Sequence, residues 1–452
     1  MKITKDRKFY RLLFSISIPI AMQNLITFAV GLIDTLMVGS LGEVQLSAVS
    51  IANNLFFVLT ILMFGLAGGS NIMISQYWGK GEKKAIQRIL SLMYIGCISI
   101  TTLFILIAAI IPEKFMMIFT TDSAVIEGGA GYLRIACIGY LFYAVANCTI
   151  IMLRSVKTVK IAMIVYSTSL VVNAILNWMF IFGNFGAPAL GVNGAAIATV
   201  IARVVEFSIV MIFMFKYEDK IRLKIKNLFY IDKLILKDYI SNCIPVLFNE
   251  LLWSTGASMV SVIVGRMGTE VVAGNSINNV VFQFVTVFIF GLSNASAVII
   301  GNTIGEGKYD KAKEYAGTIG VFSVVMGIIA AIVITIIKPI VVDFYNVSEM
   351  TKIIAMDIMG VTSIVIVFMS LGVNMMMGVL RGGGDAKFVL INDIIFMWLV
   401  AVPGGFLAAF VWEMPVALVF LILKSDEILK SFVSLVRVAS GKWINDVTRE
   451  IA

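Results

Sequence analysis

The sequence predicts an all-α integral membrane protein with twelve transmembrane helices, arranged as two six-helix lobes. Three observations carry this prediction: an apolar composition, repeated apolar runs of membrane-spanning length, and an internal repeat. Hydrophobic residues make up 60% of the 452 residues, charged residues only 14%, and the mean hydropathy is +0.99. Soluble domains carry about 25% charged residues. The runs lack the alternation typical of barrel strands, so we expect helices to cross the bilayer.

Twelve apolar runs are separated by short polar segments. A bilayer core about 30 Å thick requires about 20 helical residues, and each run meets that length. The last run is interrupted by Lys424, Asp426, Glu427 and Lys430, so its end is the least defined. The predicted spans are 12–38, 45–72, 89–111, 130–152, 161–182, 192–215, 240–264, 271–300, 315–337, 354–379, 389–410 and 414–434.

Positive charge is distributed unevenly between the two sides of these spans. Of the 35 Lys and Arg residues, 29 fall on the side that carries both termini and 4 on the other side. Lys and Arg accumulate in cytoplasmic loops. We therefore expect a multi-pass protein of the cell membrane with both termini in the cytoplasm. The same distribution explains the net charge of +8 without a nucleic-acid partner.

The sequence repeats itself on either side of a basic linker at 216–237. Segments 38–42 and 264–268 match at an offset of 226, and the same offset pairs Pro19 with Pro245. Each half contains six spans, so both halves enter the membrane in the same direction. Parallel repeats of this kind are related by an axis along the membrane normal, and transporter sites lie between the halves. We predict an N-lobe at 1–226 and a C-lobe at 227–452, the latter ending in a cytoplasmic tail.

Asp34 interrupts the first apolar run. A charge at the bilayer centre costs about 2.5–3.5 kcal/mol on insertion scales, so a carboxylate there indicates a functional site. Gln23 and Thr27 share its helical face. The alternative is a structural acid bonded to a neighbouring helix. The repeat places Val260 opposite Asp34, so the acid belongs to one half only, which favours function.

The seventh span carries a second acid, Glu250, whose repeat partner is Asn24. Ser254 follows Glu250 by one helical turn. Pro245 lies five residues before Glu250, and its partner Pro19 occupies the first span. Proline removes a backbone hydrogen bond inside a helix, so we predict that both prolines bend the helices that carry the acids. Simple helix curvature is the alternative.

Asparagine and glutamine are dense within the spans. Single amides of this kind serve most often as interhelical contacts worth about 0.6–2 kcal/mol. Together they would line a polar lumen for a cation or an organic solute. The candidates for this substrate cleft, besides Gln23, Asn24, Thr27 and Ser254, are Asn147, Asn173, Asn177, Asn279, Gln283 and Asn374.

The sequence argues against an enzyme and against a cofactor. It contains no histidine, which is the commonest general base and metal ligand. None of its Gly-Lys pairs completes a phosphate-binding loop. The four cysteines have no Cys-x-x-Cys spacing, and we interpret them as reduced, small hydrophobic residues.

Several segments together resemble the MATE (multidrug and toxic compound extrusion) family of transporters. These segments are 34–42, 76–81, 191–199 and 380–385. The resemblance implies two six-helix lobes around a V-shaped cleft, and export of cationic or hydrophobic compounds in exchange for Na⁺ or H⁺. It also implies that Asp34 is a coupling residue and that Glu250 marks a cation site, with Na⁺ as the candidate ion.

We therefore hypothesise a secondary antiporter that works by alternating access as a monomer in membrane lipid, with small cationic substrates. Asn177 and Ser370 stand where two branches of the family carry a further acid, so the coupling ion stays open. The alternative function is a lipid-linked glycan flippase or polysaccharide exporter of the same superfamily. Few intramembrane arginines are available to hold its phosphate.

Overall fold

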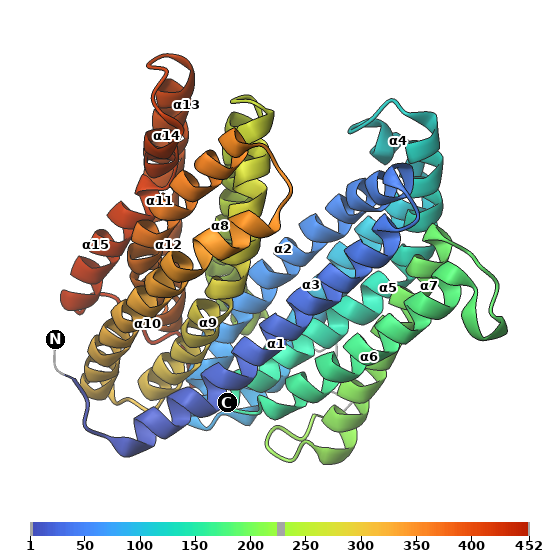
Figure 1. Cartoon of the computed structure of the whole chain (residues 1–452). Coiled ribbons are helices and arrows are strands. Elements are labelled where there is room, and N and C mark those ends of the chain that lie inside the picture. Colours follow the sequence, from blue (N-terminus) through green and yellow to red (C-terminus); the bar gives the residue numbers. More distant parts are fainter. Residues whose placement is uncertain (1–2, 224–230, 451–452) are drawn as a thin grey trace. The chain divides into compact units, whose positions relative to one another are not determined.

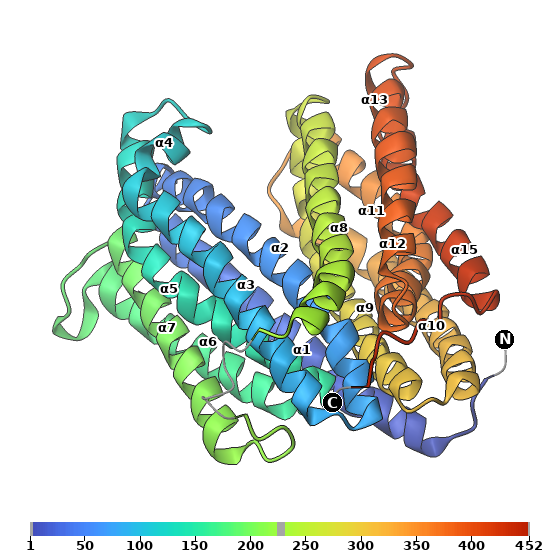
Figure 2. The same cartoon turned by 180° about the vertical axis from the view of Figure 1, so that it is seen from behind.

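A computed structural model describes residues 3–223 and 231–450, and this part of the chain is helical without a β-strand. Figure 1 and Figure 2 show the helices from opposite sides. In the first half they are α1 (Arg7–Gly39), α2 (Glu43–Lys80), α3 (Lys83–Ile110), α4 (Pro112–Met117), α5 (Ser123–Ser155), α6 (Lys160–Phe182) and α7 (Val192–Ile212), which continues as a π-helix, η2 (Phe213–Tyr217).

The second half begins with α8 (Lys233–Gly265), α9 (Thr269–Gly305) and α10 (Tyr309–Phe344). Two of its later spans contain π-helical stretches between α-helical ones. The remaining elements are α11 (Glu349–Val373), η4 (Asn374–Leu380), α12 (Ala386–Asp393), η5 (Ile394–Ala401), α13 (Val402–Phe410), α14 (Val416–Leu423) and α15 (Ser425–Ala439).

Eleven helices in the described residues are long and apolar enough to cross a membrane. They coincide with the first eleven predicted spans and extend several residues past most of them. The prediction of an all-helical membrane fold is therefore confirmed. The apolar pattern did not predict two short helices, α4 and the 3-10 helix η1 (Asn184–Gly186).

The predicted twelfth span at 414–434 is not a single helix. The chain breaks at Lys424, so that α14 and α15 are separate, and α15 continues to Ala439. Asp426 and Lys430 on α15 are buried, whereas Phe432 and Val436 are exposed at 54% and 70%. Polar side chains that face protein while apolar ones face outward are typical of a helix set in lipid.

The chain forms two compact units, and each takes residues from both halves of the sequence. One unit holds Met1–Ala21, Asn71–Glu82 and Ile244–Ala452; the other holds Met22–Ser70 and Lys83–Cys243. The predicted boundary at 226/227 lies outside the described residues, and the division into halves stays a prediction.

Close helix crossings explain why the first helix of each half is shared between the units. A Cβ atom on Gly291 of α9 would approach the Ser17 carbonyl oxygen of α1 to 2.9 Å. Likewise, a Cβ atom on Gly69 of α2 would approach Cys243 Cα of α8 to 2.5 Å. Ser17 and Cys243 are 226 positions apart and the two glycines are 222 apart, so equivalent helices cross in the two cases, with the glycine displaced by about one helical turn.

A third crossing within the first unit joins the ends of α2 and α9. A Cβ atom on Gly79 would overlap the Asn302 carbonyl oxygen, and one on Gly305 would overlap the Gln76 carbonyl oxygen. Gly79 pairs with Gly305, and Gln76 with Asn302, at the repeat offset of 226. The contact is therefore reciprocal, as an axis between two repeats requires.

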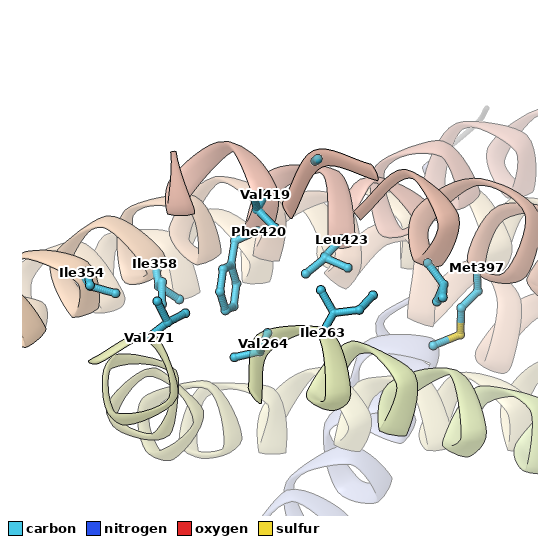
Figure 3. Packing of buried hydrophobic residues seen from close by; sticks show 11 residues of the cluster. Ile263, Val264, Val271, Ile354, Ile358, Met397, Val419, Phe420 and Leu423 are labelled. Carbon is cyan, nitrogen blue, oxygen red and sulfur yellow. The ribbon is translucent and has the colours of Figure 1, made fainter. Parts of the chain in front are cut away.

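The C-terminal helices of the first unit pack around an apolar cluster, shown in Figure 3. Ile263 and Val264 of α8 and Ile358 of α11 meet Phe420 and Leu423 of α14 there. Phe420 is 4% exposed and Leu423 is 2% exposed. This packing anchors α14 although the helix is only eight residues long.

Candidate functional site

Asp34 lies in the part of α1 that belongs to the second unit, and it is half-buried. Asn177 Nδ2 of α6 donates a hydrogen bond of 2.5 Å to Asp34 Oδ1. The same nitrogen lies 3.1 Å from Asn173 Oδ1, one helical turn earlier. Both asparagines are buried, at 3% and 1% exposure. The structure therefore joins three of the predicted residues in one polar contact between α1 and α6.

A buried ion pair on α7 lies close to this contact. Arg203 Nη1 donates to both carboxylate oxygens of Glu206 at 2.9 Å, and Ser169 Oγ of α6 donates to Glu206 Oε1 at 2.5 Å. The Arg203 guanidinium also lies 4.7 Å from the ring centre of Tyr143 and interacts through space with Asp34. The pair supplies a fixed charge distribution beside the Asp34 carboxylate.

Gln23, one of the predicted cleft residues, contacts an arginine that the site prediction did not include. Arg154 Nη2 at the end of α5 donates a hydrogen bond to Gln23 Oε1. The two side chains are buried, at 7% and 5% exposure. The sequence had placed Arg154 among the loop cations, whereas the structure buries it between helices.

Glu250 forms an ion pair in the first unit. Arg381 Nη1, which follows η4, donates to Glu250 Oε1 at 2.6 Å, and Arg381 Nη2 donates to Asn249 Oδ1. Asn249 Nδ2 in turn donates to Asp393 of α12. Lys430 Nζ of α15 lies 2.6 Å from Asp393 Oδ1.

Lys430 closes this polar network, because it also lies 2.8 Å from Asp426 Oδ2. The network therefore runs from α8 to α15 through charged side chains and the neutral amide of Asn249. Each of its charged groups contacts at least one group of opposite charge, as buried ionised groups require.

The arginine contacts of the two halves are repeats of one another. Gln23 pairs with Asn249 at an offset of 226, and Arg154 pairs with Arg381 at an offset of 227. In each half an arginine after the fourth span thus donates to an amide on the first span. The matching Leu-Arg pairs in the two halves were the sequence signal from which both arginines could have been predicted.

The other predicted residues lie apart from these contacts. Asn147 is buried and donates to Tyr143 Oη at 3.1 Å, and Asn374 is buried and donates to the Ser370 carbonyl oxygen at 2.8 Å. Thr27 is exposed and bonds back to the Gln23 carbonyl oxygen of its own helix. Asn24 and Ser254 are half-buried, and Asn279 and Gln283 are exposed.

Pro19 and Pro245 lie inside α1 and α8, which continue past them as helices. Their role in bending stays a prediction.

A cation site at Glu250 would need oxygen atoms that converge on one point. Within the described residues no group of three or more His, Cys, Asp or Glu side chains does so. The Glu250 and Asn249 side-chain oxygens instead contact the Arg381 guanidinium. In this state the donor set around Glu250 holds an internal cation, and it does not fit a sodium ion as well.

An apolar pocket lies between α8 and α13, away from the polar contacts. Met259, Val262, Pro403 and Phe406 line it, with Arg266 at its edge. None of the predicted polar residues contributes to it, so the pocket is not part of the candidate ion site.

With the fold and the polar contacts in place, comparison with known proteins defines the class of the protein. A family model described as MatE matches residues 19–179 and 245–407, and the two matches begin 226 residues apart, which is the repeat offset. They cover more than half of the chain. The protein is a multi-pass transporter with a duplicated helical fold.

It belongs to the MATE family. The probable multidrug resistance protein NorM of Thermotoga maritima is 25% identical over 437 residues, covering 95% of this chain and 92% of that protein. The multidrug resistance protein MdtK of Yersinia enterocolitica is 23% identical, covering 88% of this chain and 87% of the relative. A solved outward-facing multidrug resistance MATE transporter superposes with a TM-score of 0.86 at 19% identity, over 98% of this chain and all of that chain. The last similarity concerns the fold alone.

Proposed function

We propose that this chain is a secondary antiporter that exports cationic or hydrophobic small molecules in exchange for Na⁺ or H⁺ by alternating access. The family membership and the names of the relatives support export of drugs or toxic compounds. We place the protein in the cell membrane with both termini in the cytoplasm, in accordance with the distribution of its Lys and Arg residues. We propose that it works there as a monomer.

The contact between Asp34 and Asn177 is the observation that carries this proposal. Asp34 lies well inside a span and forms no salt bridge with the described residues, whereas Glu206 is paired with Arg203. A carboxylate inside a span that forms no salt bridge is able to exchange a proton or a metal cation, because no ion pair has to be broken first. We assign Asp34 the role of ion-responsive switch.

Glu250 has a different role in this proposal. Because Arg381 already contacts it at 2.6 Å, a transported cation reaches the Glu250 carboxylate only by displacing the guanidinium. We therefore treat Glu250 as a second, conditional cation or substrate contact. The polar residues Asn147, Ser254, Asn279, Gln283 and Asn374 remain candidates for the cleft wall.

Substitution of Asp34 by Asn tests the proposal. Asp34→Asn keeps the size of the side chain and an oxygen that can accept the hydrogen bond from Asn177 Nδ2, but it is neutral and does not titrate. In reconstituted vesicles with an imposed ion gradient, we expect efflux of a cationic dye to fall at least tenfold while the amount of inserted protein stays unchanged.

A matched control is Asp343→Asn at the end of α10, an exposed acid outside the predicted spans and without an ion pair in the described part of the chain. This variant should export the dye at the wild-type rate. Undiminished gradient-driven efflux by Asp34→Asn would remove Asp34 from the mechanism.

A further inference from the structure

Arg154 carries a buried positive charge that the described residues do not neutralise. The residue is 7% exposed, and within the described residues its guanidinium donates one hydrogen bond, from Nη2 to Gln23 Oε1. Its Nε atom is buried without a hydrogen-bond partner, and no carboxylate in the described segments forms an ion pair with it. Arginine stays protonated and has five N–H donors, so most of its capacity is unused.

An unpaired cation inside a helical membrane protein is unfavourable unless an anion joins it. Two other arginines, one in each unit, show how this chain solves the same problem elsewhere. Arg203 is paired with Glu206, and Arg381 is paired with Glu250. Arg154 is therefore an exception that requires an explanation.

The repeat shows which group is missing. Arg154 and Arg381 are equivalent, and both donate to an amide on the first helix of their own half, Gln23 or Asn249. The residue after that amide is Glu250 in the second half, where it neutralises Arg381, but Asn24 in the first half. The first half thus has the same arrangement with the carboxylate replaced by a neutral, half-buried amide.

We propose that Arg154, with Gln23 and Asn24, forms a binding site for a carboxylate of a solute. This inference rests on the proposed transport function and specifies its substrates, which would include zwitterions with a carboxyl group. The free Nε–H of Arg154 and an adjacent Nη–H form a planar fork that matches two carboxylate oxygens. A single guanidinium between neutral amides balances a monoanion.

Binding of two dyes to the purified full-length protein tests the site. Rhodamine 110 carries a free carboxylate, and rhodamine 123 is its methyl ester, so the pair differs at the group that Arg154 would hold. We expect Asn24→Glu to weaken binding of the acid at least tenfold, measured by fluorescence anisotropy, and to change binding of the ester less than twofold. The introduced carboxylate should reproduce the pairing of Glu250 with Arg381 and also raise Tm.

The control variants distinguish the effect of the charge introduced at position 24 from the effect of side-chain size and from a general loss of dye binding. Asn24→Gln has the length of the Glu variant without its charge and should retain the affinity for the acid. Arg154→Gln should lose that affinity, and Arg134→Gln, which removes an exposed arginine of α5 paired with Glu113, should not. The proposal would be overturned if Asn24→Glu lost affinity for both dyes equally, or if its affinity for the acid were unchanged.

Two further arms identify the source of the carboxylate and isolate the transport claim. If acetate displaces the acid dye from wild-type protein and raises Tm in wild type but not in Asn24→Glu, a free small carboxylate also uses the site, which supports it. If wild-type vesicles export neither dye while the binding difference persists, the proposed transport function fails and the carboxylate site stands.

Discussion

At the scale of single residues, the amide of Asn177 decides how the Asp34 carboxylate is held. The 2.5 Å contact is the hydrogen bond that fixes Asp34 to α6. Hydrogen bonds to charged groups contribute about 1.5–3 kcal/mol, which corresponds to roughly a tenfold or larger change in an equilibrium constant. We predict that Asn177→Leu lowers gradient-driven dye efflux about tenfold in vesicles.

Asn294→Leu serves as the control, because Asn294 is exposed and, among the residues that the structure describes, bonds only to the Phe290 carbonyl oxygen of its own helix. Gradient-driven dye efflux by the Asn294→Leu variant should stay near the wild-type rate. If both variants retain full efflux, the Asn177 contact has no part in coupling.

The ion pair of Glu250 with Arg381 predicts a stability effect. Removing one partner of a buried pair leaves an uncompensated charge and costs about 3–5 kcal/mol. Both side chains are largely buried, at 13% and 11% exposure. We therefore expect Glu250→Gln to lower the free energy of unfolding by about that amount, measured by chemical denaturation in detergent.

Glu270→Gln, an exposed acid at the start of α9, should leave stability unchanged. The double variant Glu250→Gln/Arg381→Met should recover part of the loss, because it removes the unpaired charge. A double variant less stable than Glu250→Gln would contradict the pairing argument.

Sequence reasoning found the acids but not all of their partners. Asp34 and Asn177 were predicted because polar residues in apolar runs are visible in the sequence. Arg154 and Arg381 were counted among loop cations, because position relative to an apolar run does not reveal whether a side chain turns inward. Burial depends on helix packing, and only the repeat indicated that both arginines occupy equivalent places.

At the scale of helices, α2 and α9 cross at Gly79 and Gly305, and this reciprocal contact predicts that a larger side chain at either glycine destabilises the protein to a similar extent. A methyl group on Gly79 or Gly305 would overlap a backbone oxygen of the facing helix. Overpacking of this kind costs about 1–3 kcal/mol. We predict that Gly79→Ala and Gly305→Ala lower Tm by similar amounts in thermal unfolding of the purified protein.

Gly31→Ala on α1 is the matched control, because a Cβ atom there meets nothing within 4 Å. It should not lower Tm. If Gly79→Ala and Gly305→Ala both kept the wild-type Tm, the two helices would be able to move apart at this crossing without loss of stability.

The sequence could predict eleven spans but not the form of the twelfth. The length of an apolar run identifies only a helix whose residues are almost all apolar. The helix α15 instead carries the buried charged residues Asp426 and Lys430. These charges are tolerated because they contact each other and Asp393. Such compensation is a tertiary property, so a composition-based prediction ended the span too early.

At the scale of the whole molecule, the repeat offset of 226 recurs in the sequence, in the helix crossings and in the two family matches. The number and type of helices followed from composition and periodicity. The sequence did not predict that the start of α1 and the end of α2 belong to the unit that contains Ile244–Ala452. That assignment depends on close contacts between helices that are far apart in the sequence.

Alternating access by an antiporter predicts reciprocal coupling between solute and ion at this scale. A solute gradient must drive the ion in the opposite direction, because a coupling free energy acts equally on both ligands. A channel or an uncoupled facilitator would release the solute without moving the ion against its gradient.

The most direct test loads vesicles containing the protein with a cationic dye, without an initial ion gradient and with the membrane potential clamped at zero. Movement of H⁺ and Na⁺ is followed as the dye leaves. We predict that one of the two ions moves inward against its developing gradient, and that this movement is absent in Asp34→Asn. Dye release with no ion movement, or inward ion movement that persists in Asp34→Asn, would contradict the account.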